Sequence, residues 1–412
     1  MALNIVWLAF FVIAFIVGLY KLIFLNDLEV FSQVTNGMFE SAKAGAEISI
    51  GLVGIMTFWL GIMKVGEKAG AISLFSRLVN PFFSKLFPGV PKNHPALGSV
   101  FMNFSANALG LDNAATPLGL KAMKELQDLN PSSDTASNAQ IMFLVLNTAG
   151  LSIIPTSVIA LRLASGSSQP AEIFVPTLLG TFISFVSGMI AVAMYQKINL
   201  FKPAILVFLL GFGGLTSGLF YWMKDMPPQQ MATYTGLIGG GIIFAIIVMF
   251  LVQGFIKKIS VYEVFIEGAK EGFQVSVMII PYLVAILVGI SAFRTTGCMD
   301  FINNSIGSLF AAMGFNTDFV PALPVGLMKI VSGSGARGLM VDIFNNPLYG
   351  PDSFVGRLAS IMQGSTETTF YVLAVYFGSV GIKKTRHALA CGLIADFIGI
   401  IAAILIAYAF YH

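Results

Sequence analysis

The chain has 412 residues, of which 56% are hydrophobic and only 10% are charged, and its formal net charge is +3. Soluble domains carry about 25% charged residues, so this composition predicts an all-α polytopic membrane protein and excludes a soluble globular domain. The basic residues form no run that would indicate nucleic-acid binding. Cys298 and Cys391 lie far apart and outside any C-x-x-C motif, which excludes a disulfide framework and a thiolate metal site.

Nine stretches are long and apolar enough to predict transmembrane helices. They lie at about 3–24, 46–63, 141–164, 173–195, 203–222, 233–256, 274–293, 354–378 and 388–410. The first is too long for a cleaved signal peptide and is expected to remain as a span. Two amphipathic segments, at about 70–87 and 298–314, are too short or too charged to cross, and the first is expected to lie on the membrane surface.

Two further segments, at about 95–124 and 320–346, have the pattern of re-entrant hairpins. Each arm of the second reaches about 9–16 Å at ~1.5 Å per residue, at most roughly half of a ~30 Å hydrocarbon core. Its glycine- and serine-rich tip, residues 332–338, is therefore predicted to stop near the bilayer midplane. Backbone at that depth needs a lining of protein or a cavity. The alternative is a surface loop between two amphipathic helices.

The order of elements predicts an inverted-topology repeat, with the first repeat at 1–202 and a linker helix followed by the second repeat at 203–412. The stretch 41–45 (Ser-Ala-Lys-Ala-Gly) resembles 268–272 (Gly-Ala-Lys-Glu-Gly), and each precedes a span, an amphipathic arm, a hairpin, an interrupted span and a closing span. Five crossings separate the two motifs, so the halves are expected to face opposite ways and bring their hairpin tips together.

The distribution of basic residues predicts the orientation of the chain. Most of those at span ends fall on one side, and Arg162 and Arg294 are among the few on the other. The positive-inside rule then places the N-terminus in the cytoplasm and the C-terminus outside.

The first hairpin carries small and amide residues in place of a fully apolar arm. Thr116-Pro117 has the pattern of an N-cap followed by proline at the first helical position. The returning arm would direct its positive end to the midplane, where an anionic or polar solute could dock. The predicted substrate contacts here are Asn103, Ser105, Asn107 and Asn113. Alternatively, these amides satisfy only the backbone of the hairpin.

Two spans are interrupted by glycine, proline and hydroxyl residues. Freed carbonyls and hydroxyls would form an oxygen-rich site suited to Na⁺ or a protonated carboxyl. The predicted substrate contacts in these breaks are Asn147, Thr148, Gln363, Ser365 and Thr366. Alternatively, the hydroxyl residues serve only to pack helices together.

Charged residues at membrane depth mark the remaining candidates, because each needs a partner or a wet cavity. Arg337, with Ser332 and Ser334 beside it, is predicted to grip a carboxylate or phosphate of the substrate. The alternative is a structural ion pair between Arg337 and an acid, of which Asp342 is the nearest along the hairpin.

The predicted ion-coupling residues are Asp112, Glu367 and Thr368. No His-Glu, Ser-His-Asp or Cys-His pairing suggests catalysis, so the protein is not expected to be an enzyme.

Several long motifs resemble known families. The stretch 110–123 (Gly-Leu-Asp-Asn-Ala-Ala-Thr-Pro-Leu-Gly-Leu-Lys-Ala-Met) resembles the signature of spore maturation protein A, and the stretches 333–340 and 362–386 resemble spore maturation protein B. The chain is therefore similar to a fusion of the two. Both belong to the nucleoside recognition, or gate-domain, group, which is similar to concentrative nucleoside transporters. The resemblance implies a bacterial cytoplasmic-membrane protein, an elevator-like transport fold and a homo-oligomer.

These observations predict a secondary transporter for a small polar solute, an anionic metabolite. No nucleotide-binding loop occurs in the sequence, so the expected energy source is Na⁺ or H⁺, and no other cofactor is expected. The expected partners are the solute, the lipid bilayer and further copies of the chain, but no nucleic acid. The alternatives are a nucleoside transporter of the same architecture and a non-transporting scaffold factor in spore maturation.

Overall fold

The computed structural model of the protein describes residues 2–91, 94–109, 112–223 and 225–412, without the side chains of 2, 3, 112–114 and 228. These residues form helices and no strand, which confirms the predicted polytopic all-α class. Within the described parts of the chain, seven helices are long and apolar enough to cross a membrane. They are α1 (Ala2–Phe24), α2 (Val30–Lys68), α8 (Phe174–Gln196), α9 (Pro203–Met223), α10 (Pro228–Ile256), α11 (Val261–Thr295) and α17 (Ala388–Tyr411).

The other two expected spans are each divided into two short helices, as predicted. The first consists of α6 (Asn138–Ala149) and α7 (Thr156–Ala164), and the second of α15 (Phe354–Ser365) and α16 (Thr369–Ser379). Gly150 ends α6 in the left-handed region at φ 44°, a conformation that glycine adopts without a steric penalty. These interruptions leave backbone groups without intrahelical partners.

Both hairpins are present, each as a pair of short helices. The first consists of α4 (Pro95–Ala108) and α5 (Asp112–Asp128), and the second of α13 (Leu323–Val331) and α14 (Gly333–Asn345). At ~1.5 Å per residue these helices are about 14–26 Å long, shorter than a ~30 Å hydrocarbon core. The lengths agree with the re-entrant assignment.

Two details of the hairpins differ from the prediction. The tip at 332–338 is not an irregular loop, since only Ser332 lies between α13 and α14. Thr116 and Pro117 do not begin the returning arm, because α5 already starts at Asp112. The Thr-Pro pattern fits a helix start locally, but proline is also tolerated near the start of a helix that has already formed.

The two amphipathic segments form α3 (Ala71–Phe83) and α12 (Cys298–Ala312). In α3, Phe82 and Phe83 are buried against α9 and α4, whereas Leu74 and Leu78 are exposed. Two short 3₁₀ turns, η1 (Pro170–Ile173) and η2 (Val320–Ala322), precede α8 and α13. The surface location of α3 stays a prediction.

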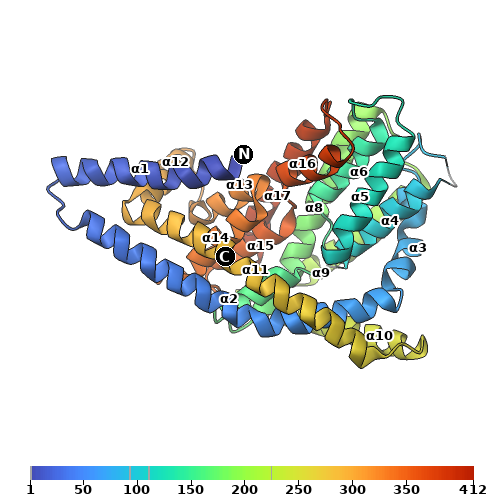
Figure 1. The fold of residues 1–412 in the computed structure, drawn as a ribbon, viewed down its shortest axis with the longest axis horizontal. Helices are drawn as coiled ribbons and strands as arrows, with labels where there is room; N and C mark the ends of the chain where they lie inside the picture. Colours follow the sequence, from blue (N-terminus) through green and yellow to red (C-terminus); the bar gives the residue numbers. More distant parts are fainter. Residues whose placement is uncertain (1, 92–93, 110–111, 224) are drawn as a thin grey trace.

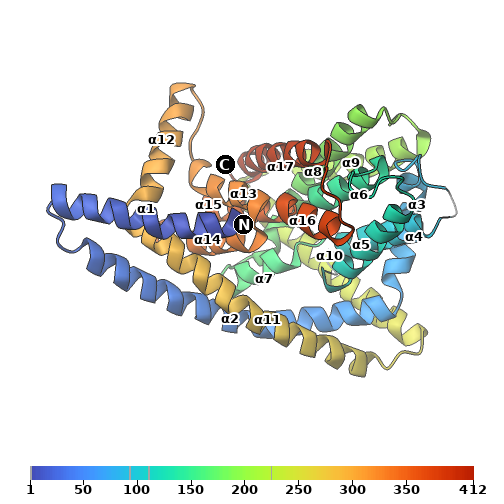
Figure 2. The same ribbon diagram turned by 45° about the horizontal axis from the view of Figure 1, so that its top comes forward.

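The helices α2 and α11 run side by side in opposite directions along one edge of the molecule (Figures 1 and 2). Gly45 of α2 approaches Val284 of α11, and Gly272 of α11 approaches Thr57 of α2. The same offset along the chain separates Gly45 from Gly272 and Thr57 from Val284, so the contacts are reciprocal. Reciprocal contacts are those expected of two helices related by a two-fold axis, and they support the predicted inverted repeat.

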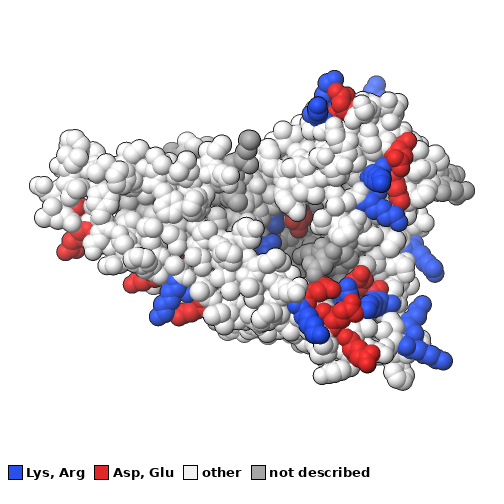
Figure 3. All heavy atoms as spheres, in the orientation of Figure 1, with Lys and Arg blue, Asp and Glu red and all other residues white. Residues whose placement is uncertain are grey.

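The hairpins and broken helices gather beside this pair, around α8 and α17, which pack against each other. One part of the core surrounds the second hairpin and another surrounds the first, and both α8 and α17 contribute to each part. Charged side chains are sparse over the end of the molecule that holds α1 and gather at the opposite end (Figure 3). The apolar surfaces of α1, α9 and α10 are mostly exposed, as expected of helices that face lipid.

Candidate functional site

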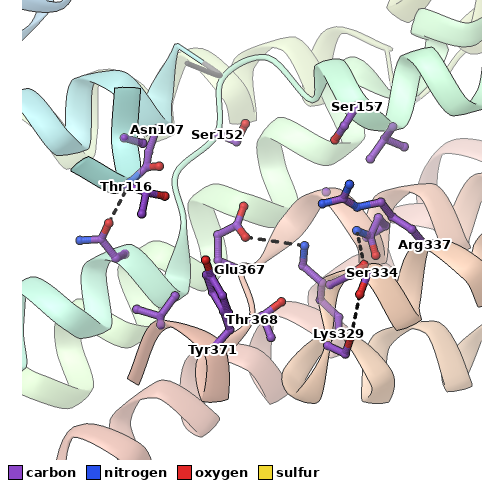
Figure 4. Close-up of a pocket in the computed structure, with 18 of the residues that line it drawn as sticks. Asn107, Thr116, Ser152, Ser157, Lys329, Ser334, Arg337, Glu367, Thr368 and Tyr371 are labelled. Carbon is purple, nitrogen blue, oxygen red and sulfur yellow. Dashed lines mark hydrogen bonds and ion pairs between the residues drawn. The ribbon is translucent and has the colours of Figure 1, made fainter. Parts of the chain in front are cut away.

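The two hairpins and the two helix breaks surround a cavity of about 650 Å³. This volume is within the usual range for small-molecule sites, roughly 300–1,000 Å³. A basic and an acidic group lie side by side in a recess near the centre of the surface in Figure 3, and Figure 4 shows the cavity lining at close range. The polar lining residues are Asn107, Thr116, Asn147, Ser152, Thr156, Ser157, Lys329, Ser332, Ser334, Arg337, Gln363, Glu367, Thr368, Tyr371 and Tyr376.

Backbone hydrogen bonds join the two breaks to one another and to the first hairpin. The N–H of Glu367, in the second break, donates to the carbonyl of Thr148 near the end of α6 at 2.8 Å. The N–H of Ile153, in the first break, donates to the carbonyl of Ala108 at the end of α4 at 2.9 Å. These bonds satisfy groups that the interrupted helices leave unpaired.

Gly150 permits the close approach of the two breaks. Its backbone is left-handed, and a Cβ at this position would lie 2.9 Å from the Cγ of Glu367. The hydroxyl of Thr181 on α8 donates to the carbonyl of Gly150 and accepts from the N–H of Ser152 at 3.2 Å. The first break is therefore anchored from behind by α8, while its other side faces the cavity.

The second hairpin presents the N-terminus of α14 to the cavity. Ser332 caps this helix, since its hydroxyl accepts from the N–H of Gly335 at 3.0 Å and lies 3.2 Å from the hydroxyl of Ser334. The amide of Gln363 reaches the carbonyl of Gly333 at 3.5 Å, so the tip is held against the second broken helix. A helix N-terminus offers N–H groups and a positive dipole end, which favour an anion.

The described charged residues of the lining carry a net charge of +1. Lys329 of α13 lies 3.8 Å from Glu367 of the second break, and the two face each other in Figure 4. Arg337 of α14 points into the cavity near Ser157. Its buried Nε has no hydrogen-bond partner among the described residues, and no carboxylate of these residues lies within ion-pair distance of its guanidinium. Arg337 is therefore available to an anionic group of a solute.

The amides of the first hairpin have mixed roles. Asn107 donates to the side-chain oxygen of Asn147 at 2.8 Å, and both line the cavity. Asn103 is fully buried and donates to the carbonyl of Ala115 at 2.7 Å, across the hairpin, and to the hydroxyl of Tyr376 at 3.4 Å. Asn103 thus satisfies the backbone of its own hairpin, as the alternative interpretation expected.

Both halves of this site lie in segments that match one protein family. The family described as Gate, nucleoside recognition, matches residues 49–165 and 276–383, more than half of the chain. The chain belongs to the Gate family. Each matched segment runs from a long helix through an amphipathic helix and a hairpin to a broken helix. The Gate assignment therefore covers both hairpins and both breaks.

Two relatives each align with a part of this chain over most of their own length. Spore maturation protein B of Bacillus subtilis (strain 168) is 51% identical over 161 residues, 39% of this chain and 88% of the relative. Spore maturation protein A of the same organism is 42% identical over 187 residues, 45% of this chain and 92% of the relative. Each covers about half of the chain, consistent with the predicted fusion.

The cavity between the Gate segments brings together eight of the predicted site residues. These are Asn107, Asn147, Ser332, Ser334, Arg337, Gln363, Glu367 and Thr368. Five others, buried behind the lining, are Asn103, Ser105, Thr148, Ser365 and Thr366. Ser105 and Ser365 donate to carbonyls one turn earlier in their own helices. The side chains of Asp112 and Asn113 lie outside the described residues.

The alternative interpretation, in which Asp342 is the ion-pair partner of Arg337, is wrong. Asp342 lies 3.2 Å from Arg294 of α11 and not beside Arg337. Arg337 is near the start of α14 and Asp342 is five residues later, on a different face of the helix. Arg294 belongs to a distant part of the sequence, which no local pattern links to the hairpin.

Several lining residues were not among the sequence candidates. Thr116, Ser152, Ser157, Tyr371 and Tyr376 all face the cavity. Ser152 and Ser157 lie within three residues of Pro155, so this proline, which marks the break, could have indicated that they line the cavity. The two tyrosines follow the second break on α16 and could not be distinguished from ordinary apolar residues of a span.

The two Gate segments are joined at one end by a partly buried cluster of charges, which we call the Arg162 cluster. It comprises Arg162 of α7, Glu172 of η1, Asp352 before α15 and Arg357 of α15. Arg162 has no exposed surface and donates to Glu172 at 2.6 Å and to Asp352 at 2.9 Å. Arg357 donates to the same Glu172 oxygen at 2.7 Å. Two cations and two acids balance, as buried charges require.

The Asp352 carboxylate of this cluster lies outside the membrane-spanning helices. Burial acts to raise its pKa, but hydrogen bonds from Ser167 and Ser168 outweigh that effect, and the pKa of Asp352 is lower than its ordinary value. The charged form of Asp352 is thus part of the folded state.

A second contact joins the segments at the opposite ends of the broken helices. The carbonyl of Asp134, before α6, accepts from the N–H groups of Lys383 and Lys384, after α16, at 2.8 and 2.9 Å. The hydroxyl of Thr135 and the ammonium of Lys384 lower the pKa of the Asp134 carboxyl. The end of α7 therefore meets the start of α15, and the start of α6 meets the end of α16, so the broken helices run in opposite directions.

Proposed function

We propose that the protein is a secondary transporter that moves a small anionic metabolite across the bacterial cytoplasmic membrane. The observation that carries this proposal is the cavity itself, which lies where two half-length hairpins and two interrupted helices meet. Helix interruptions of this kind are tolerated in membranes where they line a cavity. They are also the usual location of solute sites in transporters built from repeats.

The charge of the lining favours an anion. Lys329 and Arg337 outnumber Glu367 among the described charged side chains, and the N-terminus of α14 adds a positive dipole end. The planar guanidinium of Arg337 can donate two parallel hydrogen bonds to a carboxylate or phosphate.

The packing supports a moving body and a stationary one. The Arg162 cluster and the Asp134 contact hold the two broken helices, α6–α7 and α15–α16, together, whereas α2 and α11 form a separate antiparallel pair. An apolar cavity of about 160 Å³ lies between this pair and the helices α7 and α14. The lining of this cavity is mainly apolar, although Arg337 reaches it, and an incompletely filled apolar interface favours sliding of one body past the other, as in an elevator-like mechanism. The ion pair of Arg294 on α11 with Asp342 on α14 also joins the two bodies and would break during such a movement.

A nucleoside is the second candidate solute. The family description refers to nucleoside recognition, and Phe370, Tyr371 and Tyr376 line the cavity beside Glu367. Aromatic faces can stack on a base, and a carboxylate can accept hydrogen bonds from ribose hydroxyls.

The test is uptake by purified protein in liposomes, offered a mixture of small carboxylates, phosphates and nucleosides and analysed by mass spectrometry. Arg337→Leu is expected to abolish uptake of the anion, whereas Arg77→Leu, an exposed residue of α3, is expected to leave it unchanged. Uptake of a nucleoside alone would favour the second candidate. If wild-type protein takes up nothing, a scaffold role in spore maturation becomes the better interpretation.

A further inference from the structure

A buried carboxyl group behind the two breaks has no role in the site described so far. Asp396 lies in the first half of α17, within an apolar helix long enough to cross the membrane. Its side chain has no exposed surface. One carboxyl oxygen accepts from the hydroxyl of Thr369, the first residue of α16, and the other has no hydrogen-bond partner among the described residues.

The surroundings of Asp396 connect it to both breaks. Gly392, one turn earlier on the same face of α17, lies against the methyl groups of Thr369 and Thr148. The hydroxyl of Thr148 is likewise buried without a partner among the described residues. Thr148 is also the residue whose carbonyl holds the N–H of Glu367. Two partnerless oxygens thus lie behind the point where the breaks join.

Among the described residues, the charged groups that act on Asp396 are few. They are Lys329 of α13 and Glu367 of the second break, which pair with each other at 3.8 Å. The helices α6, α8 and α10, which also pack against α17, contain no acidic or basic residue. The helix α15 packs there too, and its one charged side chain, Arg357, pairs with Glu172. The titratable residues of α16 are Tyr371 and Tyr376.

We propose that Asp396 binds and releases the proton that couples solute movement to the proton gradient, an inference that rests on the proposed transport function. A carboxylate that has, among the residues described, a single hydrogen-bond donor and no cation within ion-pair distance is costly at this depth, so the resting form is the neutral acid. The proton is taken from water on one side and returned to water on the other as the body that holds both breaks moves past α2 and α11, and only the O–H bond of Asp396 is made and broken.

The same geometry explains why an anion and a proton would move together. An anion bound beside Lys329 and Arg337 adds negative charge near Asp396 and offsets the positive charge of Lys329. Both effects favour the protonated carboxyl, because charges interact strongly where water is excluded. By linkage, protonation of Asp396 strengthens anion binding by the same factor. Glu367 is less suited to this task, since its side chain is 54% exposed and lies against Lys329.

The direct test is infrared difference spectroscopy of purified protein in lipid at neutral pH, with the proton as the only ligand. Wild type is expected to show a protonated-carboxyl band that Asp396→Asn lacks. Glu40→Gln, which alters an exposed acid of α2, should retain it. Thr369→Val keeps the acid and removes its donor, so the band should shift in frequency. A band that persists unchanged in Asp396→Asn overturns the assignment.

Transport completes the test. In liposomes with an inward proton gradient, wild type is expected to concentrate the anion, whereas Asp396→Asn should exchange anion across the membrane but no longer concentrate it. Accumulation by Asp396→Asn equal to wild type, or a requirement for Na⁺ in place of the gradient, overturns the coupling role. Absence of any uptake by wild type overturns the proposed function and the coupling role together, even where the infrared band is assigned to Asp396.

Discussion

Replacement of Arg162 by leucine tests whether the two halves of the protein are held together by buried charges. Arg162 donates to the carboxylates of Glu172 and Asp352, to the carbonyl of Pro351 and to the hydroxyls of Ser167 and Ser360. Leucine keeps part of the apolar volume and removes all five bonds. It also leaves two acids and one cation in a site that was neutral.

The magnitude follows from the burial of the partners. Glu172 has essentially no exposed side-chain surface and keeps one cationic partner, Arg357, at 2.7 Å. Removal of one member of a buried ion pair costs about 3–5 kcal/mol, because an uncompensated charge remains inside the protein. A second change, Glu172→Gln in the Arg162→Leu background, is expected to restore part of that loss, since it removes the surplus charge.

Thermal unfolding in lipid nanodiscs, followed by tryptophan fluorescence, measures the effect. Arg162→Leu should melt several degrees below wild type, and Arg77→Leu, whose side chain is exposed, should remain within about 0.5 kcal/mol of it. Equal melting of Arg162→Leu and wild type would refute the claim that this cluster joins the halves. Failure of Glu172→Gln to restore any stability would refute the electrostatic explanation.

Three further predictions concern packing and pH. Gly272→Ala should destabilise the protein by about 1–3 kcal/mol, because the new Cβ would meet the backbone of α2. Gly54→Ala should stabilise the protein by up to about 1 kcal/mol, because no described atom lies within 4 Å of the new Cβ. Thermal unfolding of the two variants distinguishes these outcomes. Because the pKa of Asp352 is lowered in the folded protein, its carboxylate contributes stability at pH values above its unfolded pKa of about 3.9. That stability is lost as the pH falls through the folded pKa. Asp352→Asn should therefore melt below wild type at pH 7 and approach the melting temperature of wild type in acid. Lys384→Ala should cost at most about 1 kcal/mol, and less in high salt, because its ion pair with Asp134 is exposed; an effect as large as that of Arg162→Leu would contradict this.

The hairpins and the helix breaks could be predicted from the sequence because local residues cause them. Gly150 and Pro155 end and restart a helix, and arms shorter than a membrane crossing are evident from length alone. The residues at these interruptions accordingly account for most of the predicted lining.

The features that were missed depend on partners distant in sequence. Arg162 has the pattern of a basic residue at a span end, and only the fold brings Asp352 to it across 190 positions. Asp396 interrupts an apolar run without any glycine or proline beside it, so no local signal distinguishes it from a tolerated polar residue. The start of α5 at Asp112 was missed because Thr116-Pro117 offers a sufficient local alternative.

The most direct test of a solute site between the hairpins is mass spectrometry of small molecules released from gently purified protein. Wild type is expected to release a small anion in an amount comparable to that of the protein. Loss of even one charge-assisted hydrogen bond in Arg337→Leu, about 1.5–3 kcal/mol, should lower the affinity for the anion by at least about 10- to 150-fold and deplete it accordingly. Equal amounts of the same anion from wild type and Arg337→Leu, or no released solute from wild type, would contradict a site at this cavity.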